Sequence, residues 1–242
     1  MQKIPKILHW CWFGDKPMPQ TNKDCVKSWA KVLPPDFKIQ LWNERNFNVR
    51  LCKFTAEAYR TKNYAFVSDY VRWYALHTFG GVYVDSDVSL LKDITPLLEH
   101  TAFGGVVNGG LFASGLILGS VPDLDICARM LEMYENERFL TDNGEPIYVN
   151  CVLRETQLME EFGFNMDFAD KVQVCGKMVV FPKEYFCGYN PETGEVYVNE
   201  KTYAMHQFSG TWMPEWMRFK VMQTNKGYKR HYDTIYNEFT YQ

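Results

Sequence analysis

The segment at residues 65–87 restricts the possible folds more than any other part of the sequence. Residues 65–79 contain neither glycine nor proline and are mostly apolar, which predicts a helix, and Gly80 and Gly81 predict its end. Residues 82–87 form a short apolar run that predicts a buried strand. A helix joined by glycines to a buried strand is typical of α/β proteins, in which helices and strands alternate.

The rest of the chain continues this alternation. We expect strands at residues 4–12, 38–42, 172–181 and, as a strand or hairpin, 195–206, with helices at 21–32 and 124–137 and an apolar stretch at 111–119. No internal repeat, low-complexity tract or glycine-serine linker divides the sequence. We therefore predict one α/β domain over residues 1–242, with a mostly parallel central sheet that binds ligands at the carboxyl ends of its strands.

Composition and charge exclude several classes of protein. A net charge of −3 argues against a nucleic-acid-binding protein, which normally presents a strongly basic face. The 7 cysteines are an odd number without a CxxC pair, which predicts reduced thiols in a cytosolic enzyme. The N-terminal residues form no apolar signal segment, and no apolar run approaches the roughly 18 residues of a membrane span. We expect a cytoplasmic location with at most peripheral membrane contact.

Asp85 and Asp87 lie two residues apart at the end of the predicted strand, so that in extended geometry both side chains leave the same face. Two carboxylates this close repel each other near a buried sheet unless a cation neutralises them. Oxygen ligands favour a hard ion such as Mg²⁺ or Mn²⁺. An EF-hand is excluded, because Leu90 and Pro96 would occupy its glycine and glutamate positions. The alternative is a turn or helix-capping pair without a metal.

Asp69 and Arg72 are three residues apart and share a face of the predicted helix. The simplest interpretation is a surface ion pair. The helix is otherwise apolar, however, which suggests that the pair lines a pocket, where Arg72 can hold a sugar hydroxyl or a phosphate and Asp69 can accept hydrogen bonds from sugar hydroxyls. His206 precedes a Ser-Gly-Thr turn that can wrap a phosphate, and its imidazole is an acceptable third ligand for Mn²⁺. A purely structural histidine is the alternative.

Five segments of the chain, in order, resemble glycosyltransferase family 32, the DXD sugar-binding transferases of bacterial capsule and surface-polysaccharide synthesis. They also resemble, more distantly, the glucosyltransferase domain of the large clostridial toxins. These segments are residues 4–14, 68–72, 80–87, 181–186 and 206–212. The resemblance implies a GT-A (Rossmann-like) fold and retention of anomeric configuration. It also implies transfer of a hexosyl unit from a UDP-sugar, with Mn²⁺ or Mg²⁺, to a saccharide or lipid-linked acceptor.

The resemblance also implies roles for single residues. On the nucleotide side, Trp12 would stack on uracil and Tyr83 would lie near the nucleotide. Asp69 and Arg72 would hold the donor sugar, and Trp212 would cap the diphosphate. Asp85 would contact the ribose and the metal shell, and Asp87 and His206 would ligate the metal. Of these, Asp69, Arg72, Asp85 and Asp87 are the candidate catalytic residues. The family usually offers an asparagine near Ala113 or Ser114, and its absence here leaves Ser114 as the candidate polar group beneath the sugar.

Two other functions fit parts of the pattern. A nucleotidyltransferase also uses acidic pairs with Mg²⁺, but residues 12–16 lack the basic glycine-rich loop that grips a triphosphate. A non-catalytic sugar-binding module would explain the aromatic residues but not the acidic pair with Asp69, Arg72 and His206. The tail from Trp216 is basic and aromatic, which is typical either of peripheral membrane binding or of an amphipathic helix packed on the domain.

Overall fold

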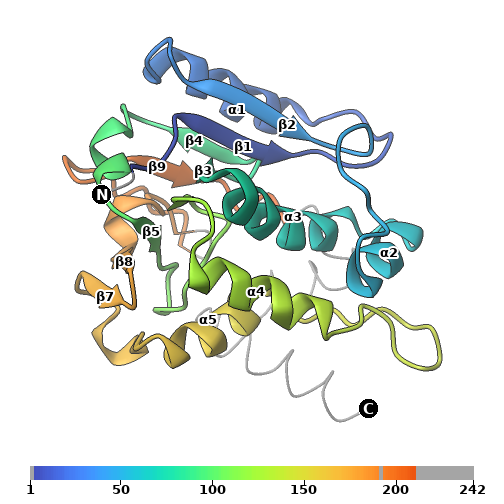
Figure 1. Cartoon of the computed structure of the whole chain (residues 1–242). Helices are drawn as coiled ribbons and strands as arrows, with labels where there is room; N and C mark the ends of the chain where they lie inside the picture. The colour runs from blue at the N-terminus through green and yellow to red at the C-terminus, as the bar shows by residue number, and fades with distance from the viewer. Residues whose placement is uncertain (1–2, 191–192, 211–242) are drawn as a thin grey trace.

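A computed structural model describes residues 3–190 and 193–210, and a seven-stranded sheet with the strand order β2-β1-β3-β6-β5-β8-β7 forms its centre (Figure 1). The strands are β1 (Ile7–Cys11), β2 (Lys38–Trp42), β3 (Gly81–Tyr83), β5 (Ala102–Gly105), β6 (Leu118–Ser120), β7 (Gln173–Cys175) and β8 (Met178–Phe181). β1 runs parallel to β2 and β3, and β5 runs parallel to β8. β6 is antiparallel to both β3 and β5, and β7 is antiparallel to β8. Hence all strands but β6 and β7 share one direction, which confirms the predicted α/β class and mostly parallel sheet.

The shared direction places the carboxyl ends of β1, β3, β5 and β8 along one edge of the sheet. The connections that leave these ends begin with Trp12, Val84, Val106 and Pro182. In open α/β sheets, ligands bind at this edge. Of the residues that the sequence singles out, Trp12, Asp85, Asp87 and Ser114 belong to these connections.

Helix α3 (Tyr64–Phe79) packs against β1, β3 and β6 and lies beside α2 (Lys53–Arg60) and α4 (Asp125–Glu135) (Figure 1). Apolar side chains are buried on most faces of this helix, and that of Trp73 is completely buried. Burial of each large side chain of this kind contributes about 1.5–3 kcal/mol to folding. Gly80 ends the helix with φ = 63°, and Gly81 follows with φ = 108°. A Cβ on Gly81 would lie 2.7 Å from the carbonyl oxygen of Ile7, so both backbone angle and space require glycine there.

A second, two-stranded sheet pairs β4 (Val88–Leu90) with β9 (Ala204–His206) in antiparallel register. The register places His206 opposite Val88, next to the acidic turn that follows β3. Helix α1 (Gln20–Val32) packs against β4, and the indole Nε1 of Trp29 donates a hydrogen bond of 2.8 Å to the carbonyl oxygen of Val88. The small sheet therefore joins two parts of the chain that are distant in sequence.

The structure also includes α5 (Cys151–Glu161) and short 3₁₀ helices at Thr95–Glu99, Met166–Phe168 and Lys183–Tyr185. No helix in the described ranges is long and apolar enough to cross a membrane. The prediction of a single domain stays a prediction, and Trp212 and the basic aromatic tail from Trp216 lie outside the described residues.

Several predicted elements have different bounds in the structure. The strand expected at 82–87 ends at Tyr83, because the chain turns after it to enter β4. The strand expected at 172–181 is a hairpin of β7 and β8, which turns at Gly176 with φ = 58°. In the apolar stretch at 111–119 only its end belongs to a strand, β6. Neither α2 nor α5 was expected from the sequence.

Candidate active site

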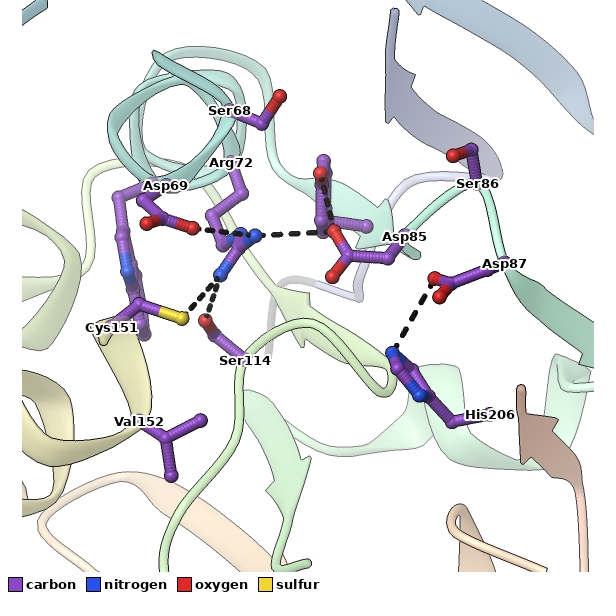
Figure 2. A network of polar contacts seen from close by, with 12 residues as sticks. Ser68, Asp69, Arg72, Asp85, Ser86, Asp87, Ser114, Cys151, Val152 and His206 are labelled. Atoms are coloured by element: carbon purple, nitrogen blue, oxygen red, sulfur yellow. Dashed lines mark hydrogen bonds and ion pairs between the residues drawn. The ribbon is translucent and has the colours of Figure 1, made fainter. Parts of the chain in front are cut away.

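The acidic motif lies in a turn, where Val88 N–H donates to the carbonyl oxygen of Asp85 at 3.1 Å. The expectation that both carboxylates leave one face of an extended strand is therefore wrong. Asp85 turns toward Arg72, whereas Asp87 turns toward His206 (Figure 2). The two carboxylates still meet, since one ligand atom each from Asp85, Asp87 and His206 lie within 4.8 Å of one another.

Arg72 is the centre of a buried polar cluster. Its Nη2 lies 2.9 Å from Oδ1 of Asp69 and 3.1 Å from Oδ1 of Asp85, and its Nη1 donates to Oγ of Ser114 at 2.8 Å (Figure 2). Arg72 is only 2% exposed, which excludes a surface ion pair. Burial would lower the pKa of Arg72, but Asp85 and Asp69 raise it well above its ordinary value, so the guanidinium stays charged.

Asp69 lies at the other side of this guanidinium and is also buried. Burial raises the pKa of Asp69 to about 7, although the positive charge of Arg72 favours its ionised form. The thiol of Cys151, at the start of α5, lies 3.4 Å from Nη1 of Arg72. A carboxyl group with this pKa can accept or donate a hydrogen bond near neutral pH.

Tyr83 fixes the position of the Asp85 carboxylate through a hydrogen bond. Its hydroxyl donates to Oδ1 of Asp85 at 2.8 Å, and its ring lies 5.1 Å from Cζ of Arg72. Oδ1 of Asp85 is thus bound by two protein groups. Its Oδ2 lies against Gly115, where an added Cβ would approach to 2.2 Å. Glycine at this position therefore leaves the space that the second carboxylate oxygen occupies.

Asp87 is held in a similar way by the segment after β9. Ser209 donates its amide N–H and its hydroxyl to Oδ2 of Asp87, at 3.0 Å and 2.8 Å. Burial would raise the pKa of Asp87, but His206 and the two bonds from Ser209 outweigh it and lower the pKa below its usual value. Oδ1 of Asp87 faces Nε2 of His206 at 3.4 Å.

The donor set fits a hard divalent cation. Asp85 and Asp87 each have one oxygen anchored by protein donors and a second that the anchoring groups do not use, which is the oxygen chemistry that Mg²⁺ and Mn²⁺ select. His206 can bind the cation only after its ring changes tautomer. The amide of Phe208 donates to Nδ1 at 2.9 Å, so the neutral ring carries its proton on Nε2. Ligation through Nε2 requires that this proton leave and that the bond from Phe208 be given up.

The other predicted donor residues lie near the same edge. Trp12 follows β1 and is partly exposed, and its Nε1 donates to the carbonyl oxygen of Lys16 at 3.1 Å. Ser114 is fully buried against Arg72. Between the two aspartates, the hydroxyl of Ser86 accepts from Nδ2 of Asn22 on α1 at 2.9 Å. The structure thus brings together Asp69, Arg72, Tyr83, Asp85, Ser114, Asp87 and His206.

Glu155, a fully buried carboxylate on α5, was not predicted from the sequence. Its Oε1 accepts from Trp73 Nε1 at 2.7 Å and from the hydroxyl of Tyr134 at 3.3 Å. Burial raises its pKa, and the charge of Arg72 opposes this effect. The available signal was a glutamate on the apolar face of a helix, with Val152, Leu158 and Met159 as buried neighbours. That signal can be used only once α5 has been recognised.

The sheet and the acidic turn after β3 are those of the GT-A fold, and comparisons agree with this fold class. Residues 19–104 match the glycosyltransferase sugar-binding region containing the DXD motif. The resemblance inferred from the sequence is therefore confirmed, and this part of the chain is similar to the DXD sugar-binding region of glycosyltransferases. The glycosyltransferase structure titled PaToxG has the same fold, with a TM-score of 0.50 and 16% identity over 66% of this chain and 69% of that one.

Curated relatives come from yeasts. Inositol phosphoceramide mannosyltransferase 1 of Schizosaccharomyces pombe is 28% identical over 113 residues, which are 43% of this chain and 34% of the relative. Mannosyl phosphorylinositol ceramide synthase SUR1 of Saccharomyces cerevisiae is 31% identical over 137 residues, which are 50% of this chain and 32% of the relative. The matches thus span about a third of the length of these relatives.

Proposed function

We propose that the chain is a retaining glycosyltransferase that transfers a hexosyl unit from a UDP-sugar to a hydroxyl of a saccharide or lipid-linked acceptor. The observation that carries this proposal is the pair of carboxylates in the turn after β3, which lies directly beside the buried Asp69–Arg72 pair. The first pair suits a cation bound to a diphosphate, and the second suits the hydroxyls of a sugar. Arg72 joins the two through Asp85.

In this proposal the site residues form three groups, which bind the metal, the donor sugar and the nucleotide. Asp85 and Asp87, with His206 as the third group, would hold Mn²⁺ or Mg²⁺, which would supply positive charge against the departing diphosphate. Asp69, Arg72 and Ser114 bind the hydroxyls of the donor sugar. Trp12 and Tyr83 belong to the nucleotide side, where Trp12 offers its ring to the base and Tyr83 positions Asp85. No residue of this set is assigned as a nucleophile, and the acceptor hydroxyl attacks from the face of the leaving group.

The names of the relatives support a second candidate for the transferred sugar. They include mannosyltransferases, which favours mannose as the hexose and a lipid-linked acceptor. Participation in surface or capsular polysaccharide synthesis stays a prediction from the family resemblance. We place the reaction in the cytoplasm, because all seven cysteines are free thiols, as is typical of proteins in reducing compartments.

A panel of sugar nucleotides tests the proposal. The chain is incubated with UDP-glucose, UDP-galactose, UDP-N-acetylglucosamine and GDP-mannose, with Mn²⁺, with Mg²⁺ and with a chelator. We expect one donor to release its nucleoside diphosphate only when metal is present, and the same donor to raise the Tm when Mn²⁺ is present. In a separate incubation with UTP and a sugar 1-phosphate, release of pyrophosphate would instead identify a nucleotidyltransferase. Binding of a sugar nucleotide without turnover would identify a sugar-binding module. An inverted product anomer would refute retention.

A further inference from the structure

The proposed donor site uses only half of the edge at which the parallel strands end. Trp12 follows β1, and Asp85 and Asp87 follow β3. Asn108 lies in the connection after β5, and Lys183 is the second residue after β8. Because β5 and β8 point in the same direction as β1 and β3, their connections continue the same ligand-binding edge.

The second half of this edge holds a polar cluster. Oδ1 of Asn108 accepts from Nζ of Lys183 at 3.3 Å and from the hydroxyl of Tyr197 at 3.1 Å. Nδ2 of Asn108 donates to the carbonyl oxygen of Tyr189 at 3.4 Å, and the ring of Tyr197 lies 5.1 Å from Nζ of Lys183. Asn108 thus contacts three residues of the segment after β8, which is distant from it in sequence.

The charge of Lys183 is held in place without being neutralised. Its ammonium contacts an amide oxygen and the face of a ring, and it forms no ion pair with a carboxylate in residues 3–190 and 193–210. Its neighbour Glu184 pairs instead with Lys201, at 3.7 Å. Lys183 is exposed, and an ammonium has three N–H donors, of which Asn108 engages one. An oriented and unneutralised cation of this kind is suited to binding an anion.

The cluster is connected to the proposed cation site through aromatic contacts. The ring of Tyr189 lies 6.4 Å from that of Phe208, which lies 4.2 Å from the ring of His206. His206 faces Asp87 at 3.4 Å, and its amide donates to the carbonyl oxygen of Cys187 at 3.1 Å. A molecule bound on Tyr189 would therefore lie on the His206 side of the proposed cation site, with Phe208 between them.

We propose that Asn108, Lys183, Tyr189 and Tyr197 form the acceptor subsite, and that it takes a hydroxylated acceptor carrying a phosphate group. This inference rests on the proposed glycosyltransferase function. Lys183 binds the phosphate, Asn108 and Tyr197 orient Lys183, and the ring of Tyr189 packs against the acceptor. The phosphate can belong to a soluble sugar phosphate or to a lipid headgroup, and both present the same chemistry to Lys183.

The test compares Lys183→Met with Lys183→Arg, which keeps the charge, and with Lys177→Met. Lys177 is a matched control, because it is exposed and precedes the same strand β8 at the opposite edge. With Mn²⁺ and a nucleoside diphosphate in excess, binding of glucose 6-phosphate and of glucose is measured by ligand-observed NMR. We expect wild type, Lys183→Arg and Lys177→Met to bind the phosphate ester more tightly than glucose. Lys183→Met should weaken that binding about tenfold or more, since a charge-assisted hydrogen bond is lost.

A second arm uses vesicles of phosphatidylcholine with and without phosphatidylglycerol, in a sedimentation assay. Binding that depends on phosphatidylglycerol and on Lys183 would identify a lipid source, whereas binding of the soluble ester alone would identify a free sugar phosphate. Metal-dependent release of nucleotide without acceptor is measured in parallel and should be the same in wild type and Lys177→Met. If the wild-type protein releases no nucleotide in the presence of metal, the proposed function is refuted. Intact release with no Lys183-dependent binding of either probe would refute the acceptor subsite alone.

Discussion

The guanidinium of Arg72 and the carboxylate of Asp85 lie 3.1 Å apart, and this ion pair joins helix α3 to the acidic turn after β3 (Figure 2). The same Nη2 lies 2.9 Å from Asp69, so one nitrogen serves a carboxylate on each side. Both partners of Arg72 belong to the proposed donor site. The position of Asp85, and with it any bound cation, therefore depends on a residue of the preceding helix.

Replacement of Arg72 by methionine should destabilise the fold as well as abolish activity. The change leaves Asp69, Asp85 and the buried Glu155 without their common cation, and breaking a buried ion pair in this way typically costs about 3–5 kcal/mol. Urea unfolding at neutral pH measures the loss. Part of it should be recovered on acidification, because protonation removes the repulsion between the carboxylates. A variant as stable as wild type at neutral pH would contradict the proposed cluster.

Replacement of Asp87 by asparagine should remove cation binding while the fold is kept. The amide has the same shape and can still accept the two bonds from Ser209, but it lacks the negative charge. The Kd for Mn²⁺, measured by calorimetry, should rise by more than about tenfold, since loss of even an outer-shell group costs 10–100-fold. Asp142→Asn is the control, because Asp142 is an exposed carboxylate in a distant loop. Equal Mn²⁺ affinity in the two variants would refute the metal site.

The elements around the site could be predicted where local signals agree. Helix α3 lacks glycine and proline and ends at Gly80, and the structure places it at Tyr64–Phe79. The apolar setting of Asp69 and Arg72 correctly predicted burial rather than a surface ion pair. These features depend on residues that are close in sequence, so the pattern alone was sufficient.

Features that depend on long-range pairing could not be predicted in this way. The strand after Gly81 ends early because β4 pairs with β9, more than 100 residues later in the chain, and draws Asp87 into a turn. Glu155 was missed for a related reason, because its hydrogen-bond partners Trp73 and Tyr134 belong to other helices, distant from it in sequence. The hydrophobic periodicity around β3 and α5 does not predict these long-range contacts.

Replacement of Gly115 by alanine should disturb the site through Asp85 alone. An added Cβ would lie 2.2 Å from Oδ2 of Asp85, so the carboxylate must move away from its present position. We expect weaker Mn²⁺ binding with a much smaller effect on stability than that of Arg72→Met. A double-mutant cycle with Asp85→Ala isolates the contact, because the methyl group should cost little once the carboxylate is absent. Effects that simply add in the double variant would show that Gly115 acts by another route.

The stability of the chain should depend on pH through Asp69. Its pKa is raised from 3.8 to about 7 in the folded protein, mainly by burial. Between these values the folded state retains a proton that the unfolded state releases, so the contribution of Asp69 to stability falls as pH rises, by up to about 1.4 kcal/mol per pH unit. Asp69→Asn cannot titrate and should lose this dependence, while Asp142→Asn should keep it. Urea unfolding of the three proteins at several pH values measures the difference. If wild type and Asp69→Asn change in parallel from about pH 4 to pH 7, Asp69 is ionised throughout and its pair with Arg72 outweighs burial.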